Sequence, residues 1–362
     1  MHERRDTAAG EASQPQSGTS RNTVLVVGGY GSVGALICQT LAARGDLDLI
    51  VAGRSPSKAA AFARSVGGRG VRLDLDDQST WEPACRGVDW VLMCMDQTDL
   101  SFVSFLFAQG IHYADITASD GFLRAVEGLA PRRSMALISV GLAPGLTNIM
   151  AAWGAARLER IERIDIGLLF GLGDRHGEAA IGWLADRIFD RARDRRVVDM
   201  AFGFGAGRRR LYAVDFSDQH SLARTLPTDA AWTGVAFESR LATAALFGMG
   251  RAFAGSRLMR DVSAAVMKRL RFGSPLCSAS VAVSGWSKGE RVATSVHFSG
   301  AVEARVTAQL AALQFEQVLS GPLVAGVHHT HQLLDPAAML EAVAARGIGK
   351  IAFGPVETLG AP

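Results

Sequence analysis

Long apolar runs, cysteine motifs and an excess of charge are all missing from this sequence. The best apolar segment, 241–250, is ten residues long, about half of the ~20 that a membrane-spanning helix needs, so no membrane span is expected. The four cysteines have neither C-x-x-C nor metal-ligand spacing, which predicts reduced thiols in a reducing compartment. The net charge of +3, with no basic-aromatic motif, gives no indication of a nucleic-acid partner.

The first 21 residues lack the apolar centre of a signal peptide. They are polar and rich in Gly, Ser and Gln, so we predict a disordered leader over 1–21 and a cytoplasmic protein. The composition is ordinary, since 48% of the 362 residues are hydrophobic and 20% are charged. These values are typical of a globular protein, and the length allows two domains.

The clearest motif is a glycine-rich turn between a strand-like and a helix-like segment. The aliphatic run 24–27 leads into Gly29-x-Gly31-x-x-Gly34. The first glycine permits a tight turn, the second lets the backbone approach a pyrophosphate, and the third lets the helix pack closely on the strand. The start of the helix directs free amides toward the phosphates. We therefore predict a dinucleotide site with contacts from Gly28, Gly29, Tyr30, Gly31, Ser32, Val33 and Gly34.

The second expected strand, 47–52, ends where the adenosine ribose should bind. A carboxylate at this position holds the ribose hydroxyls of NAD, whereas an arginine accommodates the 2′-phosphate of NADP. The sequence has no acid here and instead has Gly53, Arg54 and Ser55. Because a guanidinium suits a phosphate dianion, we predict NADP (NADPH) in preference to NAD. The alternative is that Arg54 is a solvated loop charge.

Strands and helices alternate up to residue 140. After the first two strands, further strands are expected at 71–75, 88–95, 111–116 and 135–140, with helices between them. Six strands and five helices in this order predict an α/β fold with a doubly wound parallel sheet of the Rossmann type. Ligands bind at the carboxyl ends of such strands. The predicted cofactor contacts therefore also include Asp74, Leu75, Met95 and Asp96.

Beyond residue 148 the pattern changes to longer strands. A hairpin with two alternating strands, 277–286 and 290–298, is the clearest element and indicates a mostly antiparallel sheet. Other strands are expected at 161–170, 197–204 and 210–214, and helices at 181–196, 240–270, 303–319 and 336–346.

Several segments together resemble the saccharopine dehydrogenase-like family, and specifically its NADP-binding domain. They are the turn 29–34, the stretch 109–117, which is similar to the family's G-x-H-Y-x-D-x-T, and the stretch 141–148, which is similar to its G-x-x-P-G-x-x-N turn. The carboxyl end also follows the family's closing pattern, with Thr307, Gly326-Val327 and Gly347-Ile348.

The resemblance implies a Rossmann domain (22–148), an inserted α+β domain for substrate and dimerisation (149–300), and C-terminal helices (301–362) that return to the first domain. Members of the family exchange hydride between a nicotinamide and a C–N or, less often, a C–C bond. The resemblance thus implies an NAD(P)-dependent oxidoreductase with a small-molecule substrate. Ala143 stands where saccharopine reductases often carry Asp, which weakens the case for saccharopine itself as the substrate.

Asp115 follows the fifth expected strand and is the candidate catalytic residue. A carboxylate near the nicotinamide can exchange a proton while hydride moves, if burial raises its pKa. The alternative is that Asp115 caps the next helix or holds the Thr117 hydroxyl. Asp96 has the same ambiguity, because it can act as an N-cap together with Thr98.

The turn after the sixth strand is the candidate substrate site. Its backbone amides, at the start of a helix, can bind a substrate carboxylate, with contacts from Pro144, Gly145, Thr147 and Asn148. No metal site is predicted, because the adjacent His328 and His329 should face opposite ways on a strand and a fourth ligand is missing. The arginines between 187 and 210 either attract an anionic substrate or form a solvated face with interleaved aspartates.

These features predict an NADP-dependent oxidoreductase that reduces an imine, formed from an amine or amino acid and a carbonyl compound, or catalyses the reverse. The alternatives are a C=C (enoyl) reductase acting on a lipid or polyketide-like substrate, and a non-catalytic NADPH-binding protein. The long strands within 277–298 need a cover for their apolar face, which together with the resemblance predicts a homodimer. A monomer whose helices at 181–196 and 240–270 cover the sheet is the alternative.

Overall fold

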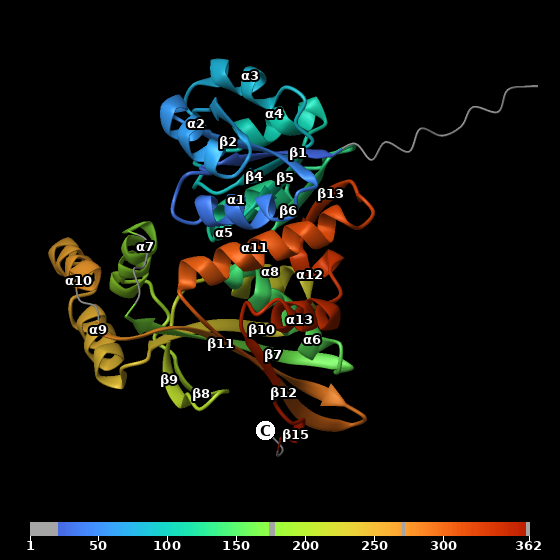
Figure 1. Cartoon of the computed structure of the whole chain (residues 1–362). Coiled ribbons are helices and arrows are strands. Elements are labelled where there is room, and N and C mark those ends of the chain that lie inside the picture. Colours follow the sequence, from blue (N-terminus) through green and yellow to red (C-terminus); the bar gives the residue numbers. More distant parts are fainter. Residues whose placement is uncertain (1–20, 174–177, 270–271, 360–362) are drawn as a thin grey trace, which may run out of the picture.

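The computed structural model describes residues 21–173, 178–269 and 272–359. Two β-sheets dominate it, and Figure 1 shows one sheet above the other with helices between and around them. The predicted leader, 1–21, lies outside the described residues except for Arg21. None of the helices in the described ranges has the length and apolarity needed to cross a bilayer.

The first sheet has seven strands, ordered β13-β6-β5-β4-β1-β2-β3, and every neighbouring pair is parallel. Six of them are the expected strands: β1 (Asn22–Val27), β2 (Leu47–Gly53), β3 (Arg69–Arg72), β4 (Trp90–Met93), β5 (His112–Asp115) and β6 (Met135–Ile138). The seventh, β13 (Gly326–His329), was missed because its four residues contain no aliphatic run. The predicted doubly wound α/β sheet is confirmed.

Helices cover both faces of this sheet. On one face, α3 (Trp81–Cys85), α4 (Ser101–Gln109) and α5 (Asp120–Glu127) contribute aromatic and aliphatic side chains to a shared core. On the other face, α1 (Gly34–Ala42) and α2 (Pro56–Ser65) pack together with α11 (Glu303–Leu319).

Helix α11 lies between the two sheets (Figure 1). Ala311 and Phe315 pack with the core of the first sheet, whereas Leu310 and Leu313 belong to the core of the second. The helix that the sequence predicts is therefore buried on two sides and joins the two halves of the molecule.

The second sheet runs β14-β12-β11-β7-β10-β9-β8, with β15 paired to β12. Only the β7–β10 pair is parallel among the described strands of this sheet, so the predicted, mostly antiparallel sheet is confirmed. The strands are β7 (Arg160–Leu172), β8 (Val197–Phe202), β9 (Gly207–Ala213), β10 (Thr228–Phe237), β11 (Phe272–Ser287), β12 (Glu290–Ala301), β14 (Lys350–Phe353) and β15 (Glu357–Thr358).

Helices of the same chain cover the apolar face of the long hairpin. Val281 and Val283 of β11 are buried in a core with residues of α6 (Thr147–Ala155), α11 and α13 (Pro336–Ala345). The hairpin does not lie at the sheet edge either, because β12 pairs with β14. The argument that this hairpin needs a second subunit as its cover was therefore wrong, since the chain supplies the cover itself.

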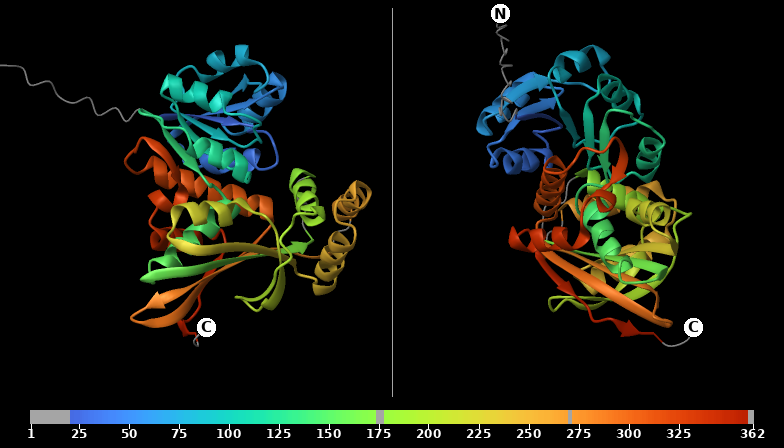
Figure 2. Two further views of the ribbon diagram at one scale, coloured as in Figure 1. Left: turned by 180° about the vertical axis from the view of Figure 1, so that it is seen from behind. Right: turned by 90° about the vertical axis from the view of Figure 1, so that its right-hand side faces the viewer.

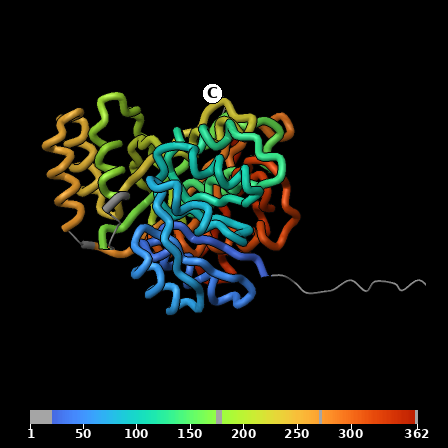
Figure 3. Tube along the Cα trace, turned by 90° about the horizontal axis from the view of Figure 1, so that it is seen from above, coloured from blue at the N-terminus to red at the C-terminus, as the bar shows by residue number. Residues whose placement is uncertain are grey.

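Three helices stand beside the two sheets as a separate group, which is plain when the molecule is seen from above (Figure 3). They are α7 (Glu178–Phe189), α9 (Arg240–Ala252) and α10 (Arg257–Arg269). The expected helix 181–196 ends at Phe189, and the expected helix 240–270 is two helices. Gly255, with a φ of +80°, lies in the turn that divides them, because a left-handed backbone suits glycine.

The C-terminal part of the chain contacts both sheets. It enters the first sheet as β13 and then the second as β14, and Figure 2 shows these red segments running from one sheet to the other. The chain therefore passes between the sheets after β6, before β13 and again after β13.

Candidate functional site

The glycine turn has little room for side chains. A Cβ added at Gly34 would lie 2.3 Å from the carbonyl oxygen of Gly28, and one at Gly28 would lie 2.6 Å from Cγ of Met95. Gly34 therefore lets α1 start directly against the turn. Gly31 has more space, because its added Cβ would lie 3.1 Å from the same oxygen, and Gly31 and Ser32 are exposed.

Tyr30 connects the turn to the end of β2. Its hydroxyl accepts a hydrogen bond from the backbone amide of Ser55 at 3.1 Å. Its ring lies against Gly53, where an added Cβ would come within 2.5 Å of Cε1. The predicted cofactor contacts Tyr30, Gly53 and Ser55 are thus neighbours in space, and Arg54, which lies between Gly53 and Ser55 in sequence, is exposed.

A hollow of about 240 Å³ lies at the carboxyl edge of the first sheet. It contains five of the predicted cofactor contacts, and its lining comprises Val27, Arg54, Leu73, Asp74, Leu75, Asp76, Trp81, Met95, Asp96, Gln97, Thr98, Asp99 and Phe102. The lining includes one arginine and four aspartates. A phosphate bound in this hollow is therefore attracted by Arg54 and repelled by the four aspartates. The distance of the phosphate from Arg54 decides how tightly a phosphorylated ligand binds.

A larger hollow of about 470 Å³ lies on the second sheet, between β9, β10 and α9. Arg208, Arg209, Arg210 and Arg240 line it, together with Asp199. Arg208, Arg209 and Arg210 are among the arginines that the sequence predicts either to attract an anionic substrate or to form a solvated face, but none of the predicted cofactor or substrate contacts lines this hollow. We assign the candidate site to the smaller hollow, because that one adjoins the glycine turn.

Asp115 lies behind the smaller hollow and is fully buried. Its carboxylate accepts hydrogen bonds from the backbone amide of Thr117 at 2.7 Å and from the Tyr113 hydroxyl. Gln97 donates to that hydroxyl at 2.5 Å and lines the hollow. Burial raises the pKa of Asp115 to about 7, although these hydrogen bonds act in the opposite direction. Asp115 is therefore linked to the hollow through Tyr113 and Gln97.

Neither Asp115 nor Asp96 caps the helix that follows it. Helix α5 is capped by Ser119 and not by Asp115, and Asp115 binds the amide of Thr117 and not its hydroxyl. Helix α4 begins at Ser101, whose amide binds the side chain of Asp99. The interpretation of Asp96 as an N-cap with Thr98 was therefore wrong, because the helix begins three residues later than expected.

The turn after β6 is buried between the two sheets. Pro144, Gly145, Thr147 and Asn148 are all buried, and the Ala143–Pro144 peptide bond is cis. The Gly145 amide donates to Oδ1 of Asn148 at 3.0 Å. Gln314 of α11 holds the backbone of Gly141, because its Oε1 accepts from the Gly141 amide and its Nε2 donates to the Gly141 carbonyl. The structure thus brings the predicted substrate contacts together, with the Gly145 amide and the Asn148 side chain already hydrogen-bonded within the protein.

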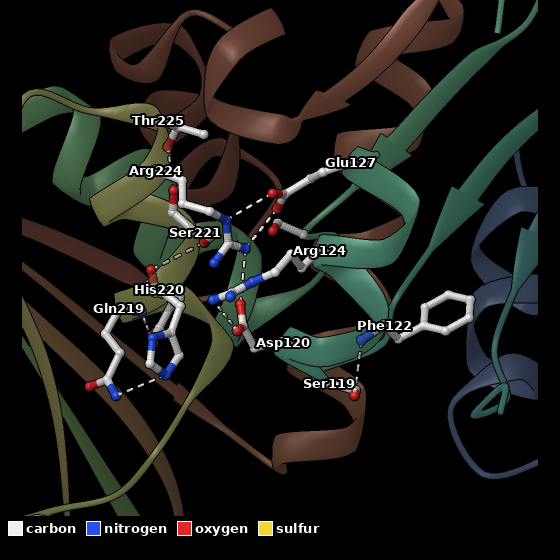
Figure 4. Close-up of polar contacts among 12 residues, drawn as sticks. Ser119, Asp120, Phe122, Arg124, Glu127, Gln219, His220, Ser221, Arg224 and Thr225 are labelled. Carbon is white, nitrogen blue, oxygen red and sulfur yellow. Dashed lines mark hydrogen bonds and ion pairs between the residues drawn. The ribbon is translucent and has the colours of Figure 1, made fainter. Parts of the chain in front are cut away.

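An ion-pair cluster joins the two halves of the molecule, and no sequence motif indicates it. Arg224 of α8 (Ser217–Thr225) makes a bidentate contact with Glu127 at 2.7 and 2.8 Å and approaches Asp120 to 2.9 Å. Figure 4 shows Arg224 pointing from α8 toward these two carboxylates of α5. Because Arg224 lies 97 or more residues from both carboxylates in sequence, only the fold reveals the cluster.

The histidines near the C-terminus belong to the same interface. His329 lies between the Ser139 hydroxyl, 2.7 Å from Nδ1, and Glu127, 3.0 Å from Nε2. Burial lowers the pKa of His329, so a neutral ring that donates to Glu127 and accepts from Ser139 satisfies both contacts. Among the residues that the structure describes, no three His, Cys, Asp or Glu side chains are grouped so as to hold a metal ion.

Comparison with known proteins agrees with this geometry. Residues 24–138 match the family described as the saccharopine dehydrogenase NADP binding domain. Apo saccharopine dehydrogenase (L-Glu forming) from Saccharomyces cerevisiae has a similar structure, with a TM-score of 0.67 and 14% identity, over 92% of this chain and 100% of that one. No curated protein matches the sequence significantly.

Two further solved structures are similar over smaller parts. GenD2 from gentamicin A biosynthesis, in complex with NAD, has a TM-score of 0.39 and 14% identity over 78% of this chain and 75% of that one. A myo-inositol dehydrogenase from Corynebacterium glutamicum has a TM-score of 0.37 and 11% identity over 75% and 74%. Residues 24–138 are therefore similar to the NADP-binding domain of saccharopine dehydrogenases, and nearly the whole chain has a fold similar to that of the Saccharomyces cerevisiae enzyme.

Proposed function

We propose that this protein is an NADP-dependent oxidoreductase that transfers hydride to or from the C–N bond of an imine or amino acid. The family and the fold support a dehydrogenase-type oxidoreductase. The observation that carries the choice of NADP is the position of Arg54, which follows the end of β2 and lines the hollow beside the glycine turn.

The residues of the turn fit a dinucleotide. Glycines at 28, 29, 31 and 34 hold the backbone in a tight turn before α1, and Gly31 and Ser32 are exposed toward a ligand. We assign the pyrophosphate to this turn and the 2′-phosphate to Arg54. When bound, the nicotinamide supplies or accepts the hydride.

Reduction of an imine requires a proton as well as hydride, since the carbon accepts hydride and the nitrogen accepts a proton. We propose that the nitrogen takes this proton from solvent and that Asp115, through Tyr113, fixes the position of Gln97, because only Gln97 of the three lines the hollow. A carboxyl group with a pKa near 7 changes its charge within the physiological range. Asp115 is thus a positioning residue, and Gln97 is the group that meets the ligand.

Our proposed substrate contacts remain Pro144, Gly145, Thr147 and Asn148. The Gly145 amide can bind a substrate carboxylate only if it exchanges Asn148 for the ligand. We also propose a cytoplasmic homodimer. Support for the dimer comes from the family resemblance alone, because the apolar face of the hairpin is covered by the chain's own helices.

Two measurements on the purified protein test this function. Calorimetric titration compares NADPH with NADH, and nicotinamide absorbance then follows turnover with two substrate panels. One panel holds imines formed from amino acids and 2-oxo acids or aldehydes, and the other holds enoyl thioesters. We expect tighter binding of NADPH and turnover of the first panel. Turnover of the second panel alone would establish the enoyl reductase, and binding without turnover of either would favour a non-catalytic protein.

A further inference from the structure

The helices α9 and α10 expose an unusual amount of apolar surface. In the part of the chain that the structure describes, twelve large apolar side chains are exposed, and six of them lie within 240–269. They are Leu241 (80% exposed), Leu258 (72%), Phe253 (48%), Val262 (46%), Val266 (45%) and Met249 (36%). The concentration marks this lobe, defined as residues 240–269 with α9 and α10, as a binding surface.

The exposed side chains form ordered faces. Leu258, Val262 and Val266 are spaced four residues apart, so they lie along one side of α10. Between Arg240 and Arg251, helix α9 has no charged residue, although its exposed positions include Ala244, Ala245 and Gly248. A solvated helix normally places charged residues on such a face.

The inner sides of the lobe are already packed. Leu246 and Phe247 of α9 share a core with Ile188 and Phe189 of α7. Ser263 of α10 is buried. The exposed apolar faces are therefore additional to those that hold the lobe on the protein.

The lobe is strongly basic. Residues 240–269 contain six basic residues (Arg240, Arg251, Arg257, Arg260, Lys268 and Arg269) and one acid, Asp261, which gives a formal charge of +5. The whole chain carries +3, so the remainder carries −2. Arg260 pairs with Asp261 and Asp186, but the balance of the lobe stays positive.

The positive charge of the lobe distinguishes between two possible binding partners, a second copy of the chain and a lipid membrane. A second copy of the lobe would bring +5 against +5, and repulsion would oppose the contact. A phospholipid surface with anionic headgroups matches both features, because it accepts apolar side chains below a layer that attracts arginine and lysine. We propose that the α9–α10 lobe docks the protein on anionic lipid membranes. Figures 1 and 3 show the lobe protruding beside the sheets, where a flat surface can reach it.

Vesicle flotation of the full chain with bound NADPH tests the proposal. We expect the protein to float with vesicles of phosphatidylcholine and phosphatidylglycerol. The fraction of protein that floats with vesicles of phosphatidylcholine alone should be at least tenfold smaller. The double variant Leu258→Asp/Val262→Asp should lose binding, and Arg251→Glu/Arg257→Glu should weaken it at least tenfold. The double variant Leu323→Asp/Val356→Asp, at exposed apolar positions outside the lobe, should float like the unmodified protein.

Each opposite result overturns the proposal. Absence of flotation with the anionic vesicles, or equal flotation of all variants, removes the membrane as the partner. Light scattering of the same samples tests whether a second copy of the chain binds the lobe instead. If the unmodified protein is a dimer that does not bind vesicles, and Leu258→Asp/Val262→Asp is a monomer, a second copy covers the lobe. Circular dichroism of each variant confirms its fold, and the readout does not depend on the proposed reaction.

Discussion

Replacing Asp115 by Asn should remove a destabilisation that grows with pH. Burial raises the pKa of this carboxyl group from 3.8 to about 7. The native state therefore holds the proton more tightly than the unfolded chain does between these values. The stability that this difference provides is complete below about pH 4 and is lost as the pH rises through 7. At 1.36 kcal/mol per pKa unit, the loss over this range is about 4 kcal/mol.

The amide that replaces the carboxyl group cannot ionise, but its oxygen can still accept the hydrogen bond from Thr117. The melting temperature of the Asp115→Asn variant should therefore rise relative to the unmodified protein as the pH increases from 4 to 8, by several degrees in total. The control is Asp229→Asn, at an exposed carboxylate on the second sheet, for which we expect a nearly constant difference. A constant difference for Asp115→Asn as well would refute the assignment of a buried, protonated carboxyl group.

Arg54→Asp should weaken NADPH binding at least tenfold and erase the preference over NADH, because a charge-assisted contact is replaced by repulsion; equal affinities of the unmodified protein for both cofactors in calorimetry would contradict the reasoning. Gly31→Val should abolish cofactor binding with an unchanged circular dichroism spectrum, whereas Gly34→Val should lower the melting temperature, since only Gly34 abuts the turn backbone at 2.3 Å. Val281→Asp should destabilise the protein by roughly 3 kcal/mol or more, because Val281 is 1% exposed, and an unchanged melting temperature would show that the face is misplaced. Light scattering should give about twice the 38.3 kDa of the chain, and a monomer mass would rule out the homodimer.

The sequence predicts most of the first sheet because its signals are local. Aliphatic runs, glycine turns and helix patterns place β1 to β6 and the helices between them close to their observed bounds. The strand β13 carries no such run, and its place beside β6 depends on a partner 191 residues away. Register with a distant strand has no signature in a single sequence.

The part of the candidate site that depends on local sequence signals was also predicted. Arg54, Asp74 and Met95 follow strands, so the rule that ligands bind at strand ends selects them, and all three line the hollow. The link from Gln97 through Tyr113 to Asp115 was missed, because it depends on how β4 and β5 lie side by side. The contacts of Arg224 and His329 with Glu127 were missed as well. They join segments that are far apart in the sequence, and no local pattern indicates that these segments meet.

The late entry of β13 into the first sheet has a consequence for synthesis on the ribosome. Until residues 326–329 emerge, β6 is an unpaired edge, although everything else in its sheet has already been made. At roughly 5–20 residues per second, the delay is about 10–40 s. During that time a hydrophobic strand, Met135–Ile138, offers free backbone groups to any other extended chain. Newly made protein should therefore depend on chaperones during this interval, and truncation before residue 326 should produce aggregates.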